Sequence, residues 1–273
     1  MLKQRVLTAL MLLPLVMAAI FALPAQWFLL LLAAILLRGS WEYSRLAGIS
    51  GLAARYLLVV LQAVIMAVGF HYKDHWDNNI LLHMSLSCAL WLLMFVRLSR
   101  YQSESQPDVT YQLVSFATAI VSITTGWFAL SWLRLQVDGS WLILLLLLIV
   151  WAADTGAYFA GKTFGKNKLA PQISPGKTRV GLLGGLIAAP LVALLAAYLM
   201  PMASINSLWL VLLGLSTALV SVGGDLLISL HKRTSGVKDS GNLLPGHGGI
   251  LDRVDSLIAA APFFALGLLV SGF

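Results

Sequence analysis

The chain has 273 residues, of which 59% are hydrophobic and only 11% are charged, and its mean hydropathy is +0.88. Soluble globular proteins are roughly half apolar, so this composition excludes that class and indicates an integral membrane protein. The formal net charge of +7 follows from basic residues kept on one side of a membrane and does not require nucleic acid as a partner. The single cysteine, Cys88, excludes a disulfide framework and a cysteine metal site.

Nine apolar runs are long enough to cross a hydrocarbon core, which takes about 20 residues with latitude for tilt. In chain order they lie near residues 5–22, 24–37, 57–72, 79–97, 111–133, 141–160, 180–200, 207–230 and 252–271. The second and third runs are short or interrupted, which leaves open that one of them is re-entrant. The expected fold class is therefore an all-α integral membrane protein with about nine transmembrane helices.

The positions of Lys and Arg predict the orientation, because positively charged loops stay in the cytoplasm. With a cytoplasmic N-terminus, sixteen of the 18 basic residues fall in cytoplasmic segments and only Lys73 and Arg134 fall outside. The first run, which follows Lys3 and Arg5, also resembles a cleavable signal peptide. The alternation of charges is satisfied with that segment retained, and this favours a first membrane helix.

The two halves of the chain differ in character. Residues 1–135 carry scattered loop charges and are interpreted as an N-terminal transmembrane scaffold. Residues 136–273 are interpreted as a C-terminal transmembrane catalytic region, because 150–256 holds two polar, glycine-rich blocks. Dense charge beside a bilayer is costly unless it binds something, so these blocks are where we expect the chemistry.

The first block contains an acid within the membrane. Asp154 lies 13 residues from the outer end of its helix at Trp141, or ~20 Å, which indicates a functional group or a carboxylate neutralised by a lysine for packing alone. Further on, Ser174-Pro-Gly-Lys-Thr178 brings Gly, Lys177 and two hydroxyls together, as at the end of a phosphate-binding loop. It lacks the first glycine of the GxxxxGK[ST] pattern and a preceding strand, so the match is weak.

The second block begins on a helix face. At helical spacing, a carboxylate, a hydroxyl and two cations share that face, namely Asp225, Ser229, Lys232 and Arg233. Asp252 and Asp255, three residues apart, share a face at the start of the last helix, where the helix dipole favours negative charge. Three acids from two helices at one depth favour metal coordination. The alternative for Asp252 is a simple helix cap, which does not account for Asp225 in the same layer.

The segment between these helices is rich in glycine, with residues Gly236, Gly241, Gly246, Gly248 and Gly249. Glycines let backbone N–H groups approach a ligand closely. A loop of this kind that is flanked by Lys, Arg and carboxylates predicts a polyphosphate ligand with a divalent cation. His247 shapes the loop or hydrogen-bonds a phosphate, and no role as a general base is assigned to it.

At these residues the chain resembles the phosphatidate cytidylyltransferases, also called CDP-diacylglycerol synthases. The signature of that family is kept at every spacing by Ser229, Lys232-Arg233, Lys238-Asp239, His247-Gly248-Gly249, Asp252-Arg253 and Asp255. Upstream elements also look like the family, namely Asp154-Thr-Gly-Ala-Tyr158, Phe164-Gly-Lys166 and Ile173-Ser-Pro-Gly-Lys-Thr178. The resemblance covers roughly residues 150–256. Two positions depart from it: His231 replaces an apolar residue, and Val180 replaces Glu or Gln.

The resemblance implies transfer of a cytidylyl group from CTP to phosphatidate, which yields CDP-diacylglycerol and pyrophosphate. The catalytic residues implied are Asp225, Lys232, Arg233, Lys238 and Asp252. The substrate-binding residues implied are Ser174, Lys177, Thr178, Ser229, His247, Gly248, Gly249 and Arg253. Mg²⁺ is the expected cofactor, held by Asp225, Asp252 and Asp255.

The expected partners are CTP, phosphatidate with bilayer lipid, and a second copy of the chain in a homodimer. We expect the protein in the inner, cytoplasmic membrane of a bacterium, with its active site facing the cytoplasm. A transporter is a different class of function, but the outer halves of the last four runs are nearly all apolar and offer no polar path across the bilayer. A lipid kinase that uses ATP is a third possibility, and only the family resemblance separates cytosine from adenine.

Overall fold

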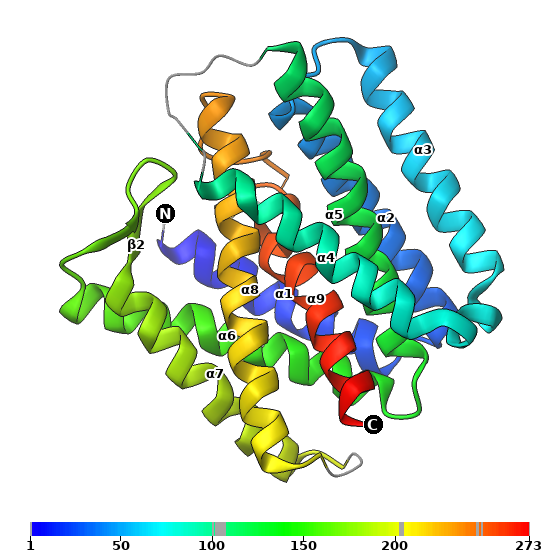
Figure 1. Ribbon diagram of the computed structural model, residues 1–273, viewed down its shortest axis with the longest axis vertical. Helices are drawn as coiled ribbons and strands as arrows, with labels where there is room; N and C mark the ends of the chain where they lie inside the picture. The colour runs from blue at the N-terminus through cyan, green and yellow to red at the C-terminus, as the bar shows by residue number, and fades with distance from the viewer. Residues whose placement is uncertain are drawn as a thin grey trace.

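A computed structural model describes residues 2–99, 101, 108–201, 205–243, 246 and 248–272. Within these ranges the chain forms nine α-helices, one short 3-10 helix (η1) and one β-hairpin (Figure 1). The elements are α1 Leu2–Phe21, α2 Ala25–Leu46, α3 Leu52–His71, η1 Lys73–Asn79, α4 Ile80–Ser99, α5 Val109–Leu135, α6 Gly139–Phe164, β1 Lys168–Ala170, β2 Ser174–Thr178, α7 Arg179–Leu199, α8 Ser207–Thr234 and α9 Leu251–Ser271. Each of the nine predicted runs falls on one of the described α-helices.

Seven of the described helical segments are long and apolar enough to cross a membrane. They are α3, α4 together with η1, and the five helices α5 to α9. The described apolar part of α1, Leu10–Phe21, is shorter, and α2 carries charged residues in its second half. A helical integral membrane protein is therefore confirmed, while the count of nine spans stays a prediction. Helix α2 also continues to Leu46, well beyond the predicted end near residue 37.

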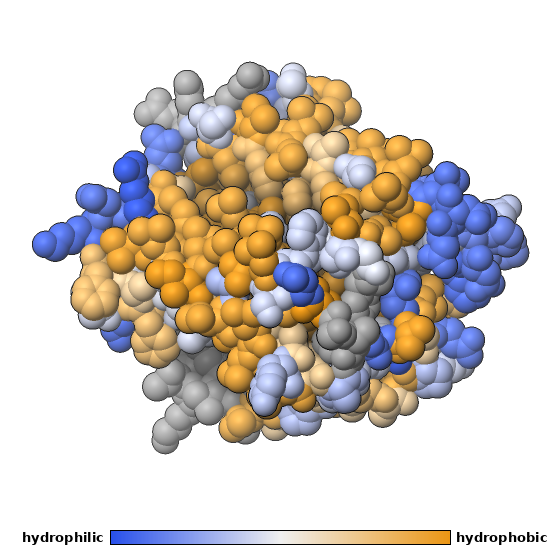
Figure 2. Space-filling view, turned by 60° about the horizontal axis from the view of Figure 1, so that its bottom comes forward, coloured by the Kyte–Doolittle hydropathy of each residue, from blue (hydrophilic) through white to orange (hydrophobic). Residues whose placement is uncertain are grey.

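The surface is suited to lipid rather than water. Figure 2 shows a face that is mostly hydrophobic, with larger hydrophilic patches at its left and right margins. Helix α3 lies at the edge of the molecule in Figure 1, and only 17% of its most apolar stretch is buried. In a bilayer such apolar side chains face hydrocarbon, so their exposure carries no penalty.

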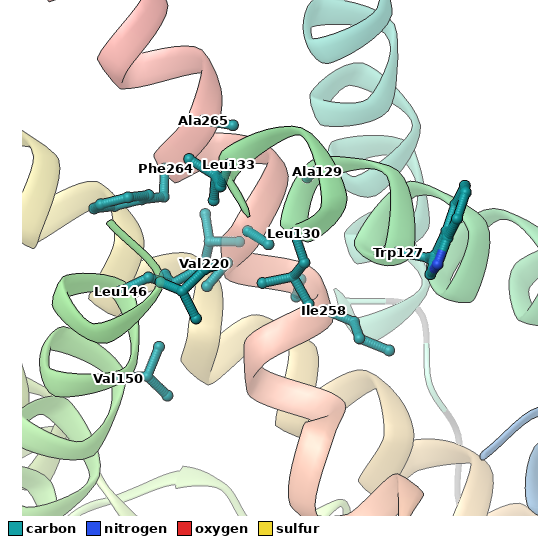
Figure 3. Packing of buried hydrophobic residues seen from close by; sticks show 14 of the residues in the cluster. Trp127, Ala129, Leu130, Leu133, Leu146, Val150, Val220, Ile258, Phe264 and Ala265 are labelled. Carbon is teal, nitrogen blue, oxygen red and sulfur yellow. The ribbon is translucent and has the colours of Figure 1, made fainter. Parts of the chain in front are cut away.

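A single large hydrophobic cluster holds the helices together, and it draws on both halves of the chain. In Figure 3, Leu130 of α5, Leu146 of α6, Val220 of α8 and Phe264 of α9 converge on the same region. These side chains are buried, and α9 packs against α5 as well as α8. The predicted scaffold and catalytic regions thus share one core, and their division of labour stays a prediction.

Helices α6 and α7 approach closely because the residues between them are small. A Cβ atom added to Gly156 would lie 2.6 Å from the Cβ of Ala188, and one added to Gly184 would meet the Cβ of Ala160. The same atom on Gly184 would lie 2.7 Å from the carbonyl oxygen of Gly156. Small residues at helix interfaces allow this contact in membranes, where lipid removes the hydrophobic driving force.

The hairpin between α6 and α7 stands at the left edge of the molecule in Figure 1. Its strands are antiparallel, with Lys168 opposite Thr178 and Ala170 opposite Ser174. The sequence analysis found no strand before Ser174, and this was wrong, since β1 precedes and pairs with β2. A strand of three residues is too short to show a period in the sequence. Thr178 ends the hairpin and caps α7 by accepting the Gly181 N–H at 3.0 Å.

The close contact between α6 and α7 predicts that Gly184→Ala destabilises the fold. The new methyl group has no room without a shift of backbone, and such overpacking costs about 1–3 kcal/mol. We expect a lower midpoint of thermal unfolding in detergent. The midpoint is measured by size-exclusion chromatography after heating. Gly51→Ala is the matched control, because nothing lies within 4 Å of its added Cβ. Equal midpoints for the two variants would contradict the packing argument.

Candidate active site

The motifs of the two polar blocks meet at one end of the helix bundle. The Lys177 Nζ on β2 lies 2.8 Å from an Oδ of Asp225 on α8. The Arg233 Nε on α8 donates to the Ile173 carbonyl oxygen, at 3.1 Å. These two contacts attach the hairpin to α8, although they join residues 48 and 60 positions apart in sequence. The structure thereby joins the phosphate-loop-like segment to the signature of the second block.

Asp225 lies between a cation and a hydroxyl. Its Oδ2 pairs with Lys177, and its Oδ1 accepts from Ser229 Oγ at 3.1 Å. The helical spacing of four residues between Asp225 and Ser229 thus produces the contact that the sequence predicts for one face. The side chain is 30% exposed, so its carboxylate remains within reach of a ligand.

Asp252 is enclosed by donors. Its Oδ1 pairs with Lys232 Nζ at 2.9 Å, and its Oδ2 accepts from the Ser240 N–H at 2.8 Å and the Gly249 N–H at 2.9 Å. Its side chain is only 4% exposed. The bond to Gly249 reaches back three residues, to a position just before the N-cap residue Ile250 of α9. Asp252 is therefore not the N-cap of α9, a position that Ile250 holds, and its ion pair and hydrogen bonds fix the loop before that helix instead.

Two further acids, Asp154 and Asp255, interact electrostatically with Asp225. Asp255 is buried, and its Oδ1 accepts the Ser256 N–H at 2.8 Å. Its carboxyl group interacts with the charge of Asp225, as does that of Asp154 on α6. The positive charge of Lys177 attracts all three of these carboxyl groups. The acids from α6, α8 and α9 are thus neighbours in the fold.

The acids predicted to hold a divalent cation offer oxygen ligands, the donor chemistry that Mg²⁺ prefers. Among the described residues, no group of three or more His, Cys, Asp or Glu side chains is placed to hold a metal ion without further ligands. Mg²⁺ is usually held by one or two carboxylates, and substrate phosphates and water complete its coordination. The accessible carboxylate of Asp225 suits such a shared site. The donor set therefore fits Mg²⁺ bound in company with a phosphate substrate.

A large apolar cavity reaches the acids from one side. It has a volume of about 670 Å³ and is walled by apolar side chains of α1, α2, α6 and α9. Its charged lining residues are Asp154, Asp252, Arg253 and Asp255. The cavity therefore combines an apolar body with a polar end that contains one arginine.

A second, more polar cleft reaches the acids from the other side. It has a volume of about 440 Å³ and lies between α6, the hairpin and α7. Its basic lining residues are Lys162, Lys168 and Lys177. Asp154 lines both this basic cleft and the apolar cavity, so the two spaces meet at its side chain.

The remaining predicted residues occupy several surroundings. Ser174 is partly exposed at the start of β2, while Thr178 is buried and caps α7. Lys238 and Arg253 are exposed, which leaves both cations open to a ligand. Gly248 has a φ of +80°, a conformation that favours glycine. The N–H of Gly249 is already used by Asp252. His247 lies outside the described residues.

His231, one of the two departures from the family pattern, is accommodated by the N-terminal half. The imidazole is fully buried, and its ring centroid lies 5.1 Å from that of Tyr43 on α2. Its Nδ1 lies 3.0 Å from the Tyr111 hydroxyl on α5. The same hydroxyl donates to the Leu46 carbonyl oxygen at 3.0 Å. The ends of α2, α5 and α8 are therefore tied together beside the site. Val180, the other departure, is partly exposed on α7.

One further acid, which was not predicted from the sequence, contacts this region. Glu42 on α2 is 1% exposed, and its carboxylate accepts hydrogen bonds from the loop before α9. An ionisable residue within an apolar helix is itself a signal of function. That signal was overlooked because the predicted run ended near residue 37.

The profile of the cytidylyltransferase family matches residues 3–270. A phosphatidate cytidylyltransferase of Pseudomonas aeruginosa is 41% identical over 274 residues, which cover 100% of this chain and 99% of that protein. A protein of the same name from Haemophilus influenzae is 35% identical over 287 residues, 97% of this chain and 98% of that protein. One from Staphylococcus haemolyticus is 40% identical over 197 residues, 71% of this chain and 72% of that protein.

These similarities extend through the N-terminal half, beyond the segment 150–256 that carries the motifs. The match thus includes α1 to α5 as well as the helices of the site. The chain belongs to the cytidylyltransferase family.

Proposed function

We propose that this protein transfers the cytidylyl group of CTP to phosphatidate and so produces CDP-diacylglycerol and pyrophosphate. The observation that carries the proposal is the meeting of an apolar cavity and a basic cleft at Asp154. The two substrates have the matching polarities, since one is a lipid and the other a water-soluble nucleotide. The names of the full-length relatives support the same reaction.

The apolar cavity suits phosphatidate. Its walls on α1, α2, α6 and α9 offer apolar contact to acyl chains, and Arg253 lies at its charged end. Arginine is well suited to a phosphate headgroup, because its planar guanidinium donates two parallel hydrogen bonds. Phosphatidate seated in this way presents its headgroup to the acids while its chains stay among apolar side chains.

The basic cleft suits the triphosphate of CTP. Lys162, Lys168 and Lys177 line it, and the exposed Lys238 lies in the loop after α8. Ammonium groups neutralise phosphate oxygens and hold them near the hairpin. Lys177 is the cation of this cleft that also contacts Asp225, so it links the nucleotide to the acidic centre.

The reaction needs positioning and charge neutralisation more than proton transfer. A phosphate oxygen of phosphatidate attacks the α-phosphorus of CTP in line, and pyrophosphate leaves. The phosphatidate headgroup is largely ionised near neutral pH, because its second pKa is about 6, and the attack requires no dedicated base. Lys177, Lys232 and Arg233 are proposed to neutralise charge that develops on the phosphates, with Ser229 as a hydroxyl donor.

The proposed Mg²⁺ ligands are Asp225, whose carboxylate is accessible, and Asp252, whose oxygens are engaged in this structure by Lys232 and by loop N–H groups. Asp255, the third predicted ligand, is buried. A divalent cation bound there would supply neutralisation of phosphate charge. The chain's own residues hold the site in shape, since Lys232 fixes Asp252 and Ser229 fixes Asp225.

The proposed location is the inner membrane of a bacterium, with nine spans, a cytoplasmic N-terminus and the active site facing the cytoplasm. The distribution of basic residues supports this orientation. CTP then reaches the basic cleft from the cytoplasm, and phosphatidate reaches the apolar cavity from the inner leaflet. Association with a second copy of the chain stays a prediction.

The substrates can be tested directly with purified protein. We expect CTP labelled on the α-phosphate, but not ATP labelled on the γ-phosphate, to transfer label to phosphatidate. We also expect a strong chelator to abolish the transfer until Mg²⁺ is restored. Labelled lipid is measured by thin-layer chromatography. Transfer from ATP would indicate a lipid kinase instead, and activity that survives the chelator would remove Mg²⁺ from the proposal.

The roles of the charged side chains can be separated by kinetics. Asp225→Asn and Asp252→Asn preserve shape while removing charge, and we expect each to lower kcat by roughly a hundredfold or more. Lys238→Ala should instead raise the KM for CTP more than it lowers kcat, because this exposed lysine is proposed only to bind the phosphates of CTP.

Asp74→Asn is the matched control for the two Asn variants. Asp74 lies on η1, and its one ion pair among the described residues is a surface contact of 3.2 Å with the adjacent Lys73. It should retain normal kinetics. Near-normal turnover in both Asp225→Asn and Asp252→Asn would show that these carboxylates serve structure alone.

The orientation can be tested by labelling single cysteines in a Cys88→Ser background. Lys166 and Asn242 are exposed on the end that holds the site, whereas Val137 is fully exposed between α5 and α6. In intact cells we expect an impermeant thiol reagent to label a cysteine at 137 and to leave those at 166 and 242 unlabelled until the membrane is permeabilised. The reverse pattern would overturn the proposed topology.

A further inference from the structure

Glu42 is a buried carboxylate from the N-terminal half that contacts the signature loop, here the segment 235–250 between α8 and α9. Its Oε2 accepts from Ser240 Oγ and from the Leu251 N–H, each at 2.9 Å. Its Oε1 accepts from the Ile250 N–H at 3.2 Å. The nearest cation is Arg38, whose Nη2 lies 3.5 Å from Oε1. The loop donors therefore lie closer to this carboxylate than its cationic neighbour does.

The two backbone bonds place Glu42 at the N-terminus of α9. The first N–H groups of a helix have no partner within the helix, and Ile250 at the N-cap supplies no side-chain hydrogen bond. Asp252 satisfies the Gly249 N–H, and Glu42 satisfies the next two along the chain. A negative charge at this end also interacts favourably with the helix dipole. Helix α9 is thus capped by a residue more than 200 positions away in sequence.

The glycines of the signature loop make room for this carboxylate. A Cβ atom on Gly241 would lie 2.7 Å from Oε1 of Glu42, and one on Gly249 would meet Oε2 of Glu42 and Oγ of Ser240. Both φ angles are outside the left-handed region, so steric room rather than backbone conformation requires glycine there. Contact with Glu42 on α2 therefore explains why residues 241 and 249 of this loop are glycines.

Ser240 connects Glu42 to Asp252. Its Oγ lies 2.9 Å from Oε2 of Glu42 and 3.0 Å from Oδ2 of Asp252, and its N–H donates to the same Oδ2 at 2.8 Å. A hydroxyl group has one proton and donates it to one carboxylate at a time. A change at Glu42 therefore alters both the start of α9 and the hydrogen bonds that orient Asp252.

We infer that Glu42 is a positioning residue for the transfer reaction: its carboxylate holds the signature loop and the start of α9, and through Ser240 it sets the place of Asp252. This inference rests on the proposed function for its kinetic consequence. Glu42 thereby gives the N-terminal half, which the sequence predicts to be a scaffold, a direct part in shaping the active site.

Glu42→Gln tests the inference with little change in shape. The amide nitrogen is a donor that faces N–H or O–H donors, so at least one of the three bonds from Ser240, Ile250 and Leu251 is lost. We expect kcat to fall about 10- to 100-fold, because a misplaced catalytic group costs that much, while the KM values for CTP and phosphatidate change less than about threefold. Hydrogen exchange measured by mass spectrometry should increase in peptides covering residues 238–255 and stay unchanged in α5 and α6.

Gln62→Leu is the matched control. Gln62 is equally buried in the N-terminal half, and its Nε2 donates to the Ala119 carbonyl oxygen at 2.8 Å, within the contact between α3 and α5. This variant loses a buried hydrogen bond without touching the signature loop. We expect its kcat and the exchange of residues 238–255 to equal those of the wild type. An equal loss of kcat in both variants would show that Glu42 contributes only to general stability, and this would overturn the inference.

Ser240→Ala tests the same link if Glu42→Gln does not fold. It removes only the hydroxyl bridge, so we expect a smaller fall in kcat and faster exchange confined to the same peptides. In the double variant the losses should not add, because both changes act on one hydrogen-bonded unit. Wild-type kcat and exchange in Ser240→Ala would show that Glu42 does not act through Asp252.

Hydrogen exchange also keeps this test separate from the proposed reaction. The measurement needs no substrate, so the loop contact is tested even if the wild-type protein transfers no cytidylyl group to phosphatidate. In that case the proposed function fails while the exchange result still decides whether Glu42 holds the loop. Unchanged exchange in Glu42→Gln, with an active wild type, would overturn the inference alone.

Discussion

A carboxylate removed from water must be matched by donors, and this constraint organises the end of the bundle where the site lies. The penalty for an unmatched buried ion is several kcal/mol. Asp252 is matched by Lys232 and by N–H groups of the signature loop, and Glu42 by the loop and the start of α9. The donors come from segments far apart in sequence. Satisfying these acids therefore fixes how α2, α8, α9 and the loop are placed relative to one another.

Small residues provide the other condition for the site. Helices α6 and α7 are in close contact, and the hairpin that joins them lies against α8, where Lys177 reaches Asp225. Asp154 on α6 lies between the basic cleft and the apolar cavity. A reaction between a nucleotide and a lipid requires two such spaces that open to different surroundings and meet at one point. The arrangement of α6 meets this requirement because its acid faces both spaces.

The N-terminal half does more than enclose the C-terminal half. Helix α1 forms part of the apolar cavity, and α2 contributes Glu42. Tyr111 on α5 joins the Leu46 carbonyl oxygen to the imidazole of His231. The Nδ1 of this buried histidine is thus matched by hydroxyl groups on α5, and its ring packs against Tyr43 of α2. The family profile likewise spans both halves, although the recognisable motifs lie in one of them.

The sequence by itself determined the class of protein, the order of the helices and the identity of the charged signature, because apolar length and residue spacing are local properties. The i, i+4 contact of Ser229 with Asp225 follows from helical geometry alone. Only the tertiary structure decided which distant groups meet: Lys177 with Asp225, Lys232 with Asp252, and Glu42 with the signature loop. It also decided that Asp252 is enclosed while Asp225 stays accessible. Such pairings depend on how helices pack and on which donors reach a buried carboxylate, and neither is encoded in any single segment.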